Sequence, residues 1–194
     1  MASNRYHFIT HWRLQGSQDE VTAIIGNAPD LARWWPSVYL EVHELEPGDE
    51  RGVGKVVSLY TKGWLPYTLR WQFRVTESRP PDGFTLVASG DFKGRGIWSF
   101  AQEGDWVNAT YDWEIEAEKP LLKYLSFLVK PLFAANHRWA MAQGEESLKL
   151  ELARRHAATQ AAAAAVPAPP GPTPNSPLRW LATVWRSKPV LQHA

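Results

Sequence analysis

Residues 68–76 read Thr-Leu-Arg-Trp-Gln-Phe-Arg-Val-Thr, and residues 107–116 read Val-Asn-Ala-Thr-Tyr-Asp-Trp-Glu-Ile-Glu. In both stretches apolar and polar side chains alternate with a period of two. Successive side chains of a β-strand point to opposite faces, so both stretches are predicted to be antiparallel strands with one solvated face and one covered face. The covered face is rich in tryptophan and tyrosine, whose rings leave irregular space between them. This composition favours a ligand pocket over a plain core.

Further strands are predicted on both sides of these two. Between residues 38 and 118, turn signals such as Pro80-Pro81-Asp82-Gly83 recur at intervals of about ten residues, which predicts six strands in an antiparallel meander. A seventh strand is predicted from Tyr6 to Leu14, with Phe8 and Trp12 as its aromatic members.

Two short helices are predicted between the first strand and the meander. The stretch Ser17-Gln18-Asp19-Glu20 matches a capping box, in which the serine hydroxyl accepts an early helical N–H and the glutamate reaches back to the cap. Asp30 is the predicted cap of the second helix. Pro36 ends that helix, because the residue before a proline is driven out of the helical region.

A long helix is predicted at the C-terminal end of the sheet. Apolar residues recur at helical spacing from Leu121 to Leu152, and Pro131 lies inside this pattern. Because proline cannot donate the backbone hydrogen bond of a helix, we expect a break or kink there. The longer helix is then predicted to run from about Pro131 to His156.

This order of elements describes an α+β protein. With Leu31-Ala32-Arg33-Trp34-Trp35-Pro36 after the second helix and Lys130-Pro131-Leu132-Phe133 at the start of the last one, the chain resembles the START-like (SRPBCC), helix-grip superfamily over about residues 5–156. Its members include polyketide cyclase/dehydrase and lipid-transport groups, aromatase/cyclases and the birch-pollen-allergen type. The resemblance implies a helix-grip fold: a curved antiparallel sheet of about seven strands wrapped around the C-terminal helix.

Composition limits the function further. With 21 basic and 20 acidic residues the chain lacks the charge of a nucleic-acid binder, and the absence of cysteine excludes disulfides and cysteine-ligated metals. On a strand, His7 and His11 lie about 13 Å apart, too far to hold one metal ion. We therefore expect no metal and no cofactor. No secretory signal is visible, so a cytoplasmic protein is expected.

The last residues form separate segments. Residues 1–156 are predicted to be the helix-grip domain, residues 157–177 an Ala/Pro-rich flexible linker, and residues 178–194 a short basic amphipathic segment. This tail could cover the pocket mouth, make transient contact with an anionic membrane surface through its arginines and Trp180 and Trp185, or be a neutral extension.

The candidate pocket residues are aromatic or apolar side chains of the covered face and the long helix. They are Trp34, Trp35, Trp64, Tyr67, Trp71, Phe73, Trp98, Tyr111, Trp113, Phe133, His137 and Met141, with Trp139 nearby. The alternative is that these rings simply fill the core. No catalytic set is evident, and the candidates for moving protons are His137, Tyr67 and Tyr111. A buried or rim histidine with purely structural contacts is the competing interpretation of His137.

Three functions remain open at this stage. The first is binding or transport of a hydrophobic small molecule, such as a lipid, isoprenoid or polyketide, without catalysis. The second is an enzyme of the cyclase/dehydrase type that uses the same cavity, where proximity supplies most of the rate. The third is a protein-interaction module that uses the tail. The sequence does not predict the oligomeric state.

Overall fold

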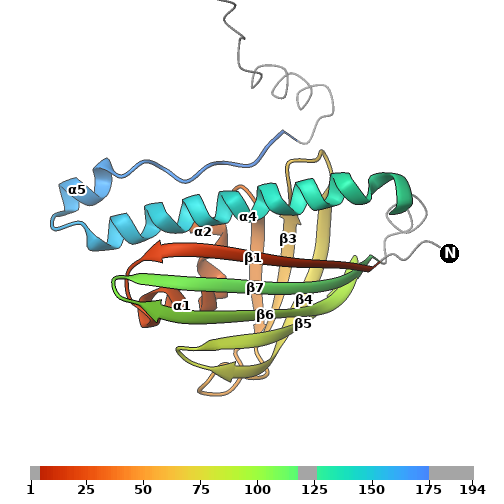
Figure 1. Ribbon diagram of the computed structural model, residues 1–194, viewed down its shortest axis with the longest axis horizontal. Helices are drawn as coiled ribbons and strands as arrows, with labels where there is room; N and C mark the ends of the chain where they lie inside the picture. Colours follow the sequence, from red (N-terminus) through yellow and green to blue (C-terminus); the bar gives the residue numbers. More distant parts are fainter. Residues whose placement is uncertain (1–4, 118–125, 175–194) are drawn as a thin grey trace, which may run out of the picture.

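Seven antiparallel strands form one curved sheet in the computed structural model, which describes residues 5–117 and 126–174 (Figure 1). The strand order is β1-β7-β6-β5-β4-β3-β2, so β2 to β7 follow one another as a meander and β1 lies beside β7. The predicted number of strands is confirmed, as are the strands predicted at Tyr6 to Leu14, residues 68–76 and residues 107–116. The strands are β1 (Arg5–Gln15), β2 (Tyr39–Glu46), β3 (Val56–Lys62), β4 (Thr68–Arg79), β5 (Gly83–Gly90), β6 (Phe92–Glu103) and β7 (Trp106–Ala117).

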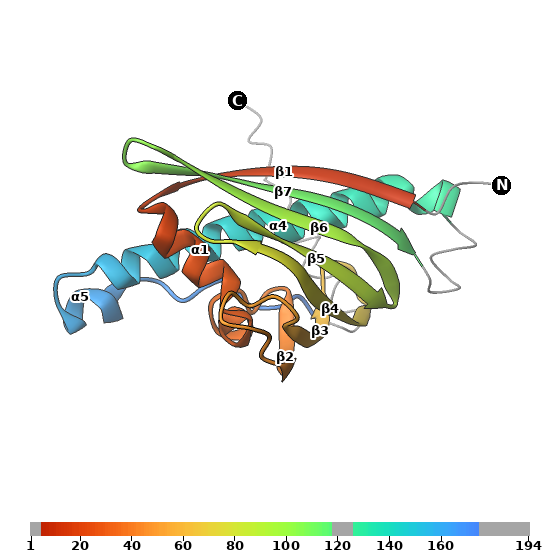
Figure 2. The same ribbon diagram turned by 90° about the horizontal axis from the view of Figure 1, so that it is seen from below.

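The period-two alternation sorts side chains between the two faces of the sheet as predicted. In β7, Val107, Ala109, Tyr111 and Trp113 are all buried, while the residues between them face outward and are partly or fully exposed. In β4 the same holds for Phe73 and Val75. The buried face is the concave one, toward which the helices pack (Figure 2).

Helix α1 (Gln18–Gly26) follows β1 and begins at the predicted cap. The Ser17 hydroxyl accepts the backbone N–H of Glu20 at 3.2 Å. The reciprocal half of the predicted capping box is absent, because the Glu20 carboxylate lies 2.7 Å from Nε2 of His156. Glu20 therefore links α1 to His156, the last residue of the long C-terminal helix, and does not cap the first turn of α1.

The second short helix differs from the prediction at its start. Residues Ala28–Asp30 form the 3₁₀ helix η1, which leads directly into α2 (Leu31–Trp34). Asp30 makes no capping hydrogen bond; its carboxylate accepts from the Arg33 guanidinium at 3.1 Å. The predicted end is confirmed, since α2 stops before Trp35 and Pro36.

Helix α4 (Ser126–His156) crosses the concave face of the sheet (Figures 1 and 2). Of the predicted break or kink at Pro131, the break is wrong, because the helix runs through this proline and begins five residues before it. Pro131 lies close to the N-terminal end, where its missing N–H removes a single early hydrogen bond. The predicted end at His156 is confirmed.

Two contacts hold α4 close to α2. At Gly144 the helix meets the indole of Trp35 so closely that a Cβ atom would come within 2.3 Å of the ring. Farther along, the Glu151 carboxylate is 3% exposed and accepts from Arg33 of α2 at 2.8 and 2.9 Å. Arg154 and Arg155 of α4 also donate to it. The C-terminal half of α4 is thereby clamped, and its N-terminal half spans the other end of the sheet.

Part of the range expected to be a flexible linker has defined structure. After α4, α5 (Gln160–Ala165) forms with Thr159 as its cap, because alanine is the residue with the highest helix propensity. The following residues run back along α4, where Arg154 donates to the Pro167 carbonyl and Lys62 donates to the Thr173 carbonyl (Figure 1). We call residues 166–174 the strap.

The division into domain, linker and tail stays a prediction, and the predicted tail segment, residues 178–194, lies outside the described residues. None of the helices within residues 5–117 and 126–174 is long and apolar enough to span a membrane.

Candidate functional site

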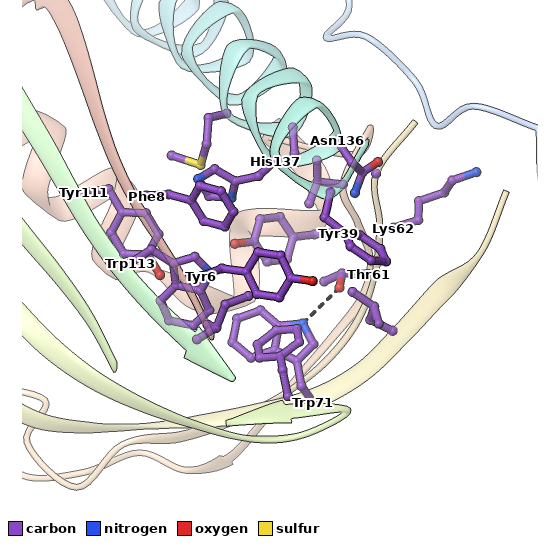
Figure 3. A pocket seen from close by; sticks show the side chains of 18 of the residues that line it. Tyr6, Phe8, Tyr39, Thr61, Lys62, Trp71, Tyr111, Trp113, Asn136 and His137 are labelled. Atoms are coloured by element: carbon purple, nitrogen blue, oxygen red, sulfur yellow. Dashed lines mark hydrogen bonds between the residues drawn. The ribbon is translucent and has the colours of Figure 1, made fainter. Parts of the chain in front are cut away.

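A cavity of about 160 Å³ lies between the concave face of the sheet and the N-terminal half of α4 (Figure 3). It exists because α4 crosses a curved surface, and the sheet side chains beneath this half of the helix do not fill the gap. The residues that line it are Tyr6, Phe8, Trp35, Val38, Tyr39, Thr61, Lys62, Gly63, Tyr67, Leu69, Trp71, Phe92, Tyr111, Trp113, Ile115, Phe133, Asn136, His137, Ala140 and Met141.

Three aromatic rings pack against one another in the sheet wall. The Trp71 ring centroid lies 4.8 Å from that of Phe92 and 5.9 Å from that of Trp113. Phe92 and Trp113 meet edge to face, with centroids 5.8 Å apart. The Trp71 indole also donates to the Thr61 hydroxyl at 2.9 Å, which fixes the orientation of the ring. This wall is therefore rigid and almost wholly apolar.

Glycine makes room for the rings of β7. A Cβ atom on Gly96 of β6 would come within 2.6 Å of the Tyr111 hydroxyl oxygen and 2.9 Å of the Trp113 ring. Gly96 pairs directly with Trp113 across the two strands. Because Gly96 has no side chain, both rings can lie flat on the concave face, where Tyr111 stacks on Trp113.

Four tyrosines, Tyr6, Tyr39, Tyr67 and Tyr111, line the cavity. Burial raises the pKa of Tyr39 and of Tyr111 well above the usual value, and the nearby Tyr39 adds to the shift at Tyr111. Burial also raises the pKa of Tyr67, followed by an effect of the neighbouring Tyr6. These phenols are therefore neutral across the physiological range and act as hydrogen-bonding groups.

His137 lies in the helical wall of the cavity. Its ring stacks on Phe8 with centroids 4.3 Å apart (Figure 3). Burial, with a smaller effect of the Arg138 charge, lowers the pKa of His137 to about 4. Its Nε2 atom is buried and has no hydrogen-bond partner among the residues that the structure describes. The imidazole is therefore neutral at pH 7, with one nitrogen as donor and the other as acceptor.

The rim of the cavity is tied to two distant parts of the chain. Asn136 of α4 accepts the Leu65 backbone N–H at 3.2 Å, and a Cβ atom on Gly63 would overlap its amide. From the other side, the Thr173 hydroxyl of the strap donates to the carbonyls of Gly63 and Trp64 at 3.2 and 3.3 Å. The loop between β3 and β4 is thus held between α4 and the strap.

Lys62 belongs to this rim but directs its charge away from the cavity. The residue is 2% exposed, and burial lowers the pKa of its ammonium group. Its side chain points outward in Figure 3, and its ammonium donates to the Thr173 carbonyl.

The structure brings most of the predicted pocket residues together. Those that line the cavity are Trp35, Tyr67, Trp71, Tyr111, Trp113, Phe133, His137 and Met141. Trp34, Phe73 and Trp98 instead line a smaller cavity of about 60 Å³. The two cavities share Trp35, Tyr39, Trp71, Tyr111 and Met141 as walls. Trp64 lines neither, and Trp139 packs against the core.

Several lining residues were missed at the level of sequence. Tyr6 and Phe8 lie on the alternating face of β1, so the same signal that selected Trp71 would have found them. Tyr39 begins β2 and has no comparable signal. Asn136, Thr61 and Lys62 are polar residues whose place at the rim follows only from the packing of α4.

One group of metal-binding residue types occurs within the described part of the chain, away from the cavity. His7, Asp112 and Glu114 lie on the outer, solvated face of β1 and β7, with their ligand atoms within 4.8 Å of one another. Nε2 of His7 is 2.8 Å from the Asp112 carboxylate, so the histidine is engaged across the strands. His11 lies 3.1 Å from the Thr110 hydroxyl on the same face.

No protein-family model and no curated protein matches the sequence. Solved structures match the fold. The Zhui aromatase/cyclase from Streptomyces sp. R1128 is similar with a TM-score of 0.64 and 14% identity, over 79% of this chain and 97% of that chain. A START superfamily protein from Mycobacterium smegmatis is similar with a TM-score of 0.52 and 16% identity, over 68% of this chain and 97% of that chain. The protein has a START-like, helix-grip fold.

Another structural neighbour is norcoclaurine synthase from Thalictrum flavum, solved in complex with dopamine and hydroxybenzaldehyde. Its TM-score is 0.54, with 17% identity over 80% of this chain and 90% of that chain. At these identities the likeness shows the fold alone, because proteins of one fold carry many functions. What a START-like chain binds has to be argued from its own cavity.

Proposed function

We propose that this protein binds a hydrophobic small molecule in the cavity between its sheet and α4. The observation that carries the proposal is the cavity itself, whose walls are mainly aromatic rings with a few polar groups. Concave, mostly apolar sites with a few placed polar groups are typical of small-molecule binding. The structural neighbour that was solved with dopamine and hydroxybenzaldehyde supports binding of small ring compounds by this fold.

The volume limits the size of the ligand. Drug-sized ligands occupy pockets of about 300–1,000 Å³, whereas an engineered apolar cavity of about 150 Å³ binds benzene. At about 160 Å³, the cavity suits a molecule with one ring, or the ringed end of a longer one. A lipid or polyketide chain would need the two cavities to join, which requires movement of the shared side chains Trp35, Tyr39, Trp71, Tyr111 and Met141.

The affinity expected from apolar contact is modest. A ligand that buries about 200 Å² of apolar surface gains about 5 kcal/mol, from which the costs of association are subtracted. A free energy of about 4 kcal/mol corresponds to a Kd of about 1 mM, so tens to hundreds of micromolar is the expected range once polar contacts contribute.

Catalysis of the cyclase/dehydrase type is the second candidate. It is favoured by the placement of His137, Tyr67 and Tyr111 in one cavity and by the similar fold of an aromatase/cyclase. Acid–base catalysis works best when the pKa of the group lies near the working pH. A pKa of about 4 makes His137 a weak base, and raised pKa values make the tyrosines weak acids. These values support binding over proton transfer.

A pair of variants on one helix tests the binding proposal. Ala140 of α4 lines the cavity, and Ala142 lies on the same helix with its side chain exposed. Ala140→Leu adds three carbon atoms to the cavity and is expected to abolish saturable binding of α-methylstyrene, measured by NMR titration. Ala142→Leu is the matched control and should bind as the original protein does. Equal affinity in a folded Ala140→Leu protein would contradict the proposal.

The ligand that the protein carries can be sought directly. Native mass spectrometry of purified protein, followed by organic extraction, is expected to yield a small apolar adduct at one molecule per chain. The third candidate, a protein-interaction role for residues 178–194, is tested separately by deleting residues 157–194 and measuring loss of a complex while the core stays folded.

A further inference from the structure

The cavity wall carries several hydrogen-bond donors. Tyr39 and Tyr111 line the cavity, and within the described residues the structure gives their hydroxyls no hydrogen-bond partner. Nε1 of Trp35 and Nε2 of His137 are buried and also have no described partner. An indole N–H can only donate, and a phenol donates one proton. The wall therefore offers at least two donors that no protein group uses.

Apart from the tyrosine hydroxyls and the neutral imidazole of His137, which can accept as well as donate, the described residues of the same wall offer few free side-chain acceptors. No aspartate or glutamate is among the described residues that line the cavity. The Thr61 hydroxyl already accepts from the Trp71 indole, and the Asn136 carbonyl oxygen already accepts from the Leu65 backbone N–H. Leaving a buried donor unsatisfied costs about 1–3 kcal/mol, so a ligand that supplies an acceptor is favoured over a pure hydrocarbon.

The charges around the cavity favour a neutral ligand. Among the lining residues that the structure describes, Lys62 is the only lysine or arginine, and its ammonium donates to the strap at Thr173. The same described lining holds no carboxylate that could pair with an amine. Burial of a charge without a partner is strongly unfavourable, so both carboxylate and ammonium ligands are disfavoured.

Building on the binding function proposed above, we infer that the cavity selects a neutral molecule of about one ring that carries an acceptor oxygen, such as an aryl ketone. The hydroxyls of Tyr39 and Tyr111 donate to this oxygen, and the ring of the ligand packs against Trp71 and Trp113. Both tyrosines line the cavity, and an acceptor oxygen with two lone pairs is able to accept one hydrogen bond from each. Figure 3 shows both tyrosines in the cavity wall.

Acetophenone and α-methylstyrene test this inference as a matched pair. They have the same shape and differ in that a C=O group replaces a C=CH₂ group. Dissociation constants of both are measured by ¹H–¹⁵N NMR titration of the full chain, the Tyr39→Phe variant and the Tyr111→Phe variant. Each variant is expected to weaken acetophenone binding about three- to tenfold, the loss of one hydrogen bond, and to change α-methylstyrene binding less than twofold.

A tyrosine outside the cavity provides the control. Tyr60 of β3 does not line the cavity, and its ring lies under the Arg70 guanidinium at 4.1 Å. Tyr60→Phe should leave the affinity for both probes unchanged. Benzoate and benzylammonium, which are charged molecules of similar size, should bind at least tenfold more weakly than acetophenone.

The possible outcomes separate the two proposals. If both probes bind and the tyrosine variants weaken both equally or neither, the donor role is overturned while binding of apolar rings stands. If a charged probe binds as tightly as acetophenone, the preference for neutral molecules is overturned. If neither neutral probe binds to the full chain, both the proposed function and this inference fail.

Discussion

At the scale of single residues, the rings that line the cavity differ in whether their polar atoms are hydrogen-bonded within the protein. The Trp71 indole donates to Thr61, whereas the hydroxyls of Tyr39 and Tyr111 and the Nε2 atom of His137 have no hydrogen-bond partner among the described residues. Buried polar groups are usually hydrogen-bonded, and each exception needs an explanation such as strain, a catalytic role or a bound water or ion. The residues of greatest interest in this protein are therefore the unsatisfied polar groups in the cavity wall.

His137 is predicted to make the fold sensitive to mild acid. Its pKa is lowered from 6.5 to about 4 on folding, mainly by burial. Between these values the unfolded chain binds a proton that the folded chain does not, so stability falls as the pH is lowered from 6.5 to 4. The loss reaches about 3 kcal/mol at pH 4. Urea unfolding between pH 4 and 7 measures this effect.

Replacement of this histidine should remove most of the pH dependence. The His137→Gln variant is expected to show a nearly flat stability between pH 6.5 and 4.5. His43→Gln is the matched control, since His43 lies exposed on β2 and should keep the slope of the original protein. An unchanged slope in His137→Gln would assign the acid sensitivity to another group.

At the scale of elements, α4 performs two tasks along its length. Its N-terminal half forms the helical wall of the cavity through Phe133, Asn136, His137 and Ala140. Its C-terminal half is clamped to α2 at Glu151. Because the clamp lies more than one turn beyond the cavity, the helix can be held firmly without filling the space that a ligand needs.

Glu151 is expected to stabilise the protein and to lose this effect only in strong acid. Hydrogen bonds from Arg33, followed by those from Arg155, hold the pKa of Glu151 at about 2 against the opposing effect of burial. A carboxylate with a lowered pKa contributes stability above pH 4.5 that is lost as the pH falls toward 2. Glu151→Gln should reduce the free energy of unfolding by about 1–3 kcal/mol at pH 7, measured by urea unfolding.

The matched control for Glu151 lies on the same helix. Glu146 is exposed, so Glu146→Gln should change the free energy of unfolding by less than about 0.5 kcal/mol. The difference between the two variants should shrink as the pH approaches 2, because the original carboxylate then becomes protonated. A Glu151→Gln protein as stable as the original at pH 7 would show that the buried cluster contributes no net stability.

At the scale of the whole molecule, three distant segments meet at the cavity rim. The loop after β3, the middle of α4 and the strap are joined through Asn136 and Thr173, whose hydrogen bonds span at least 71 residues of chain. The strap therefore contacts the rim of the cavity, although none of the residues 166–174 lines the cavity itself. This arrangement predicts that the rim loop opens when either support is removed.

Hydrogen exchange tests this coupling. Asn136→Ala removes the acceptor of the Leu65 amide and is expected to speed its exchange about tenfold or more, because that amide then depends on local opening. Thr173→Val removes the strap's hydroxyl and should speed the same amide to a smaller extent. Amides in the long pairing of β1 with β7 serve as the internal reference and should not change. Unaltered exchange at Leu65 in both variants would refute the coupling.

Much of this architecture is readable from the sequence because its signals are local. The period-two alternation of residues 68–76 and 107–116 predicted the strands and the covered face, and the Ser17 cap predicted the start of α1. Trp71, Tyr111 and Trp113 could be selected for the cavity because they occupy this face. In such cases a few neighbouring residues determine which way each side chain points.

Only the tertiary structure decided the volume and the polar chemistry of the cavity. Its size depends on how far α4 stands from the sheet, which Gly144 against Trp35 and Glu151 against Arg33 determine. Tyr39, Tyr111 and His137 line the same cavity but belong to β2, β7 and α4, which lie far apart in the chain. A local pattern shows which face a residue occupies, but the distance between two faces follows from packing of the whole molecule.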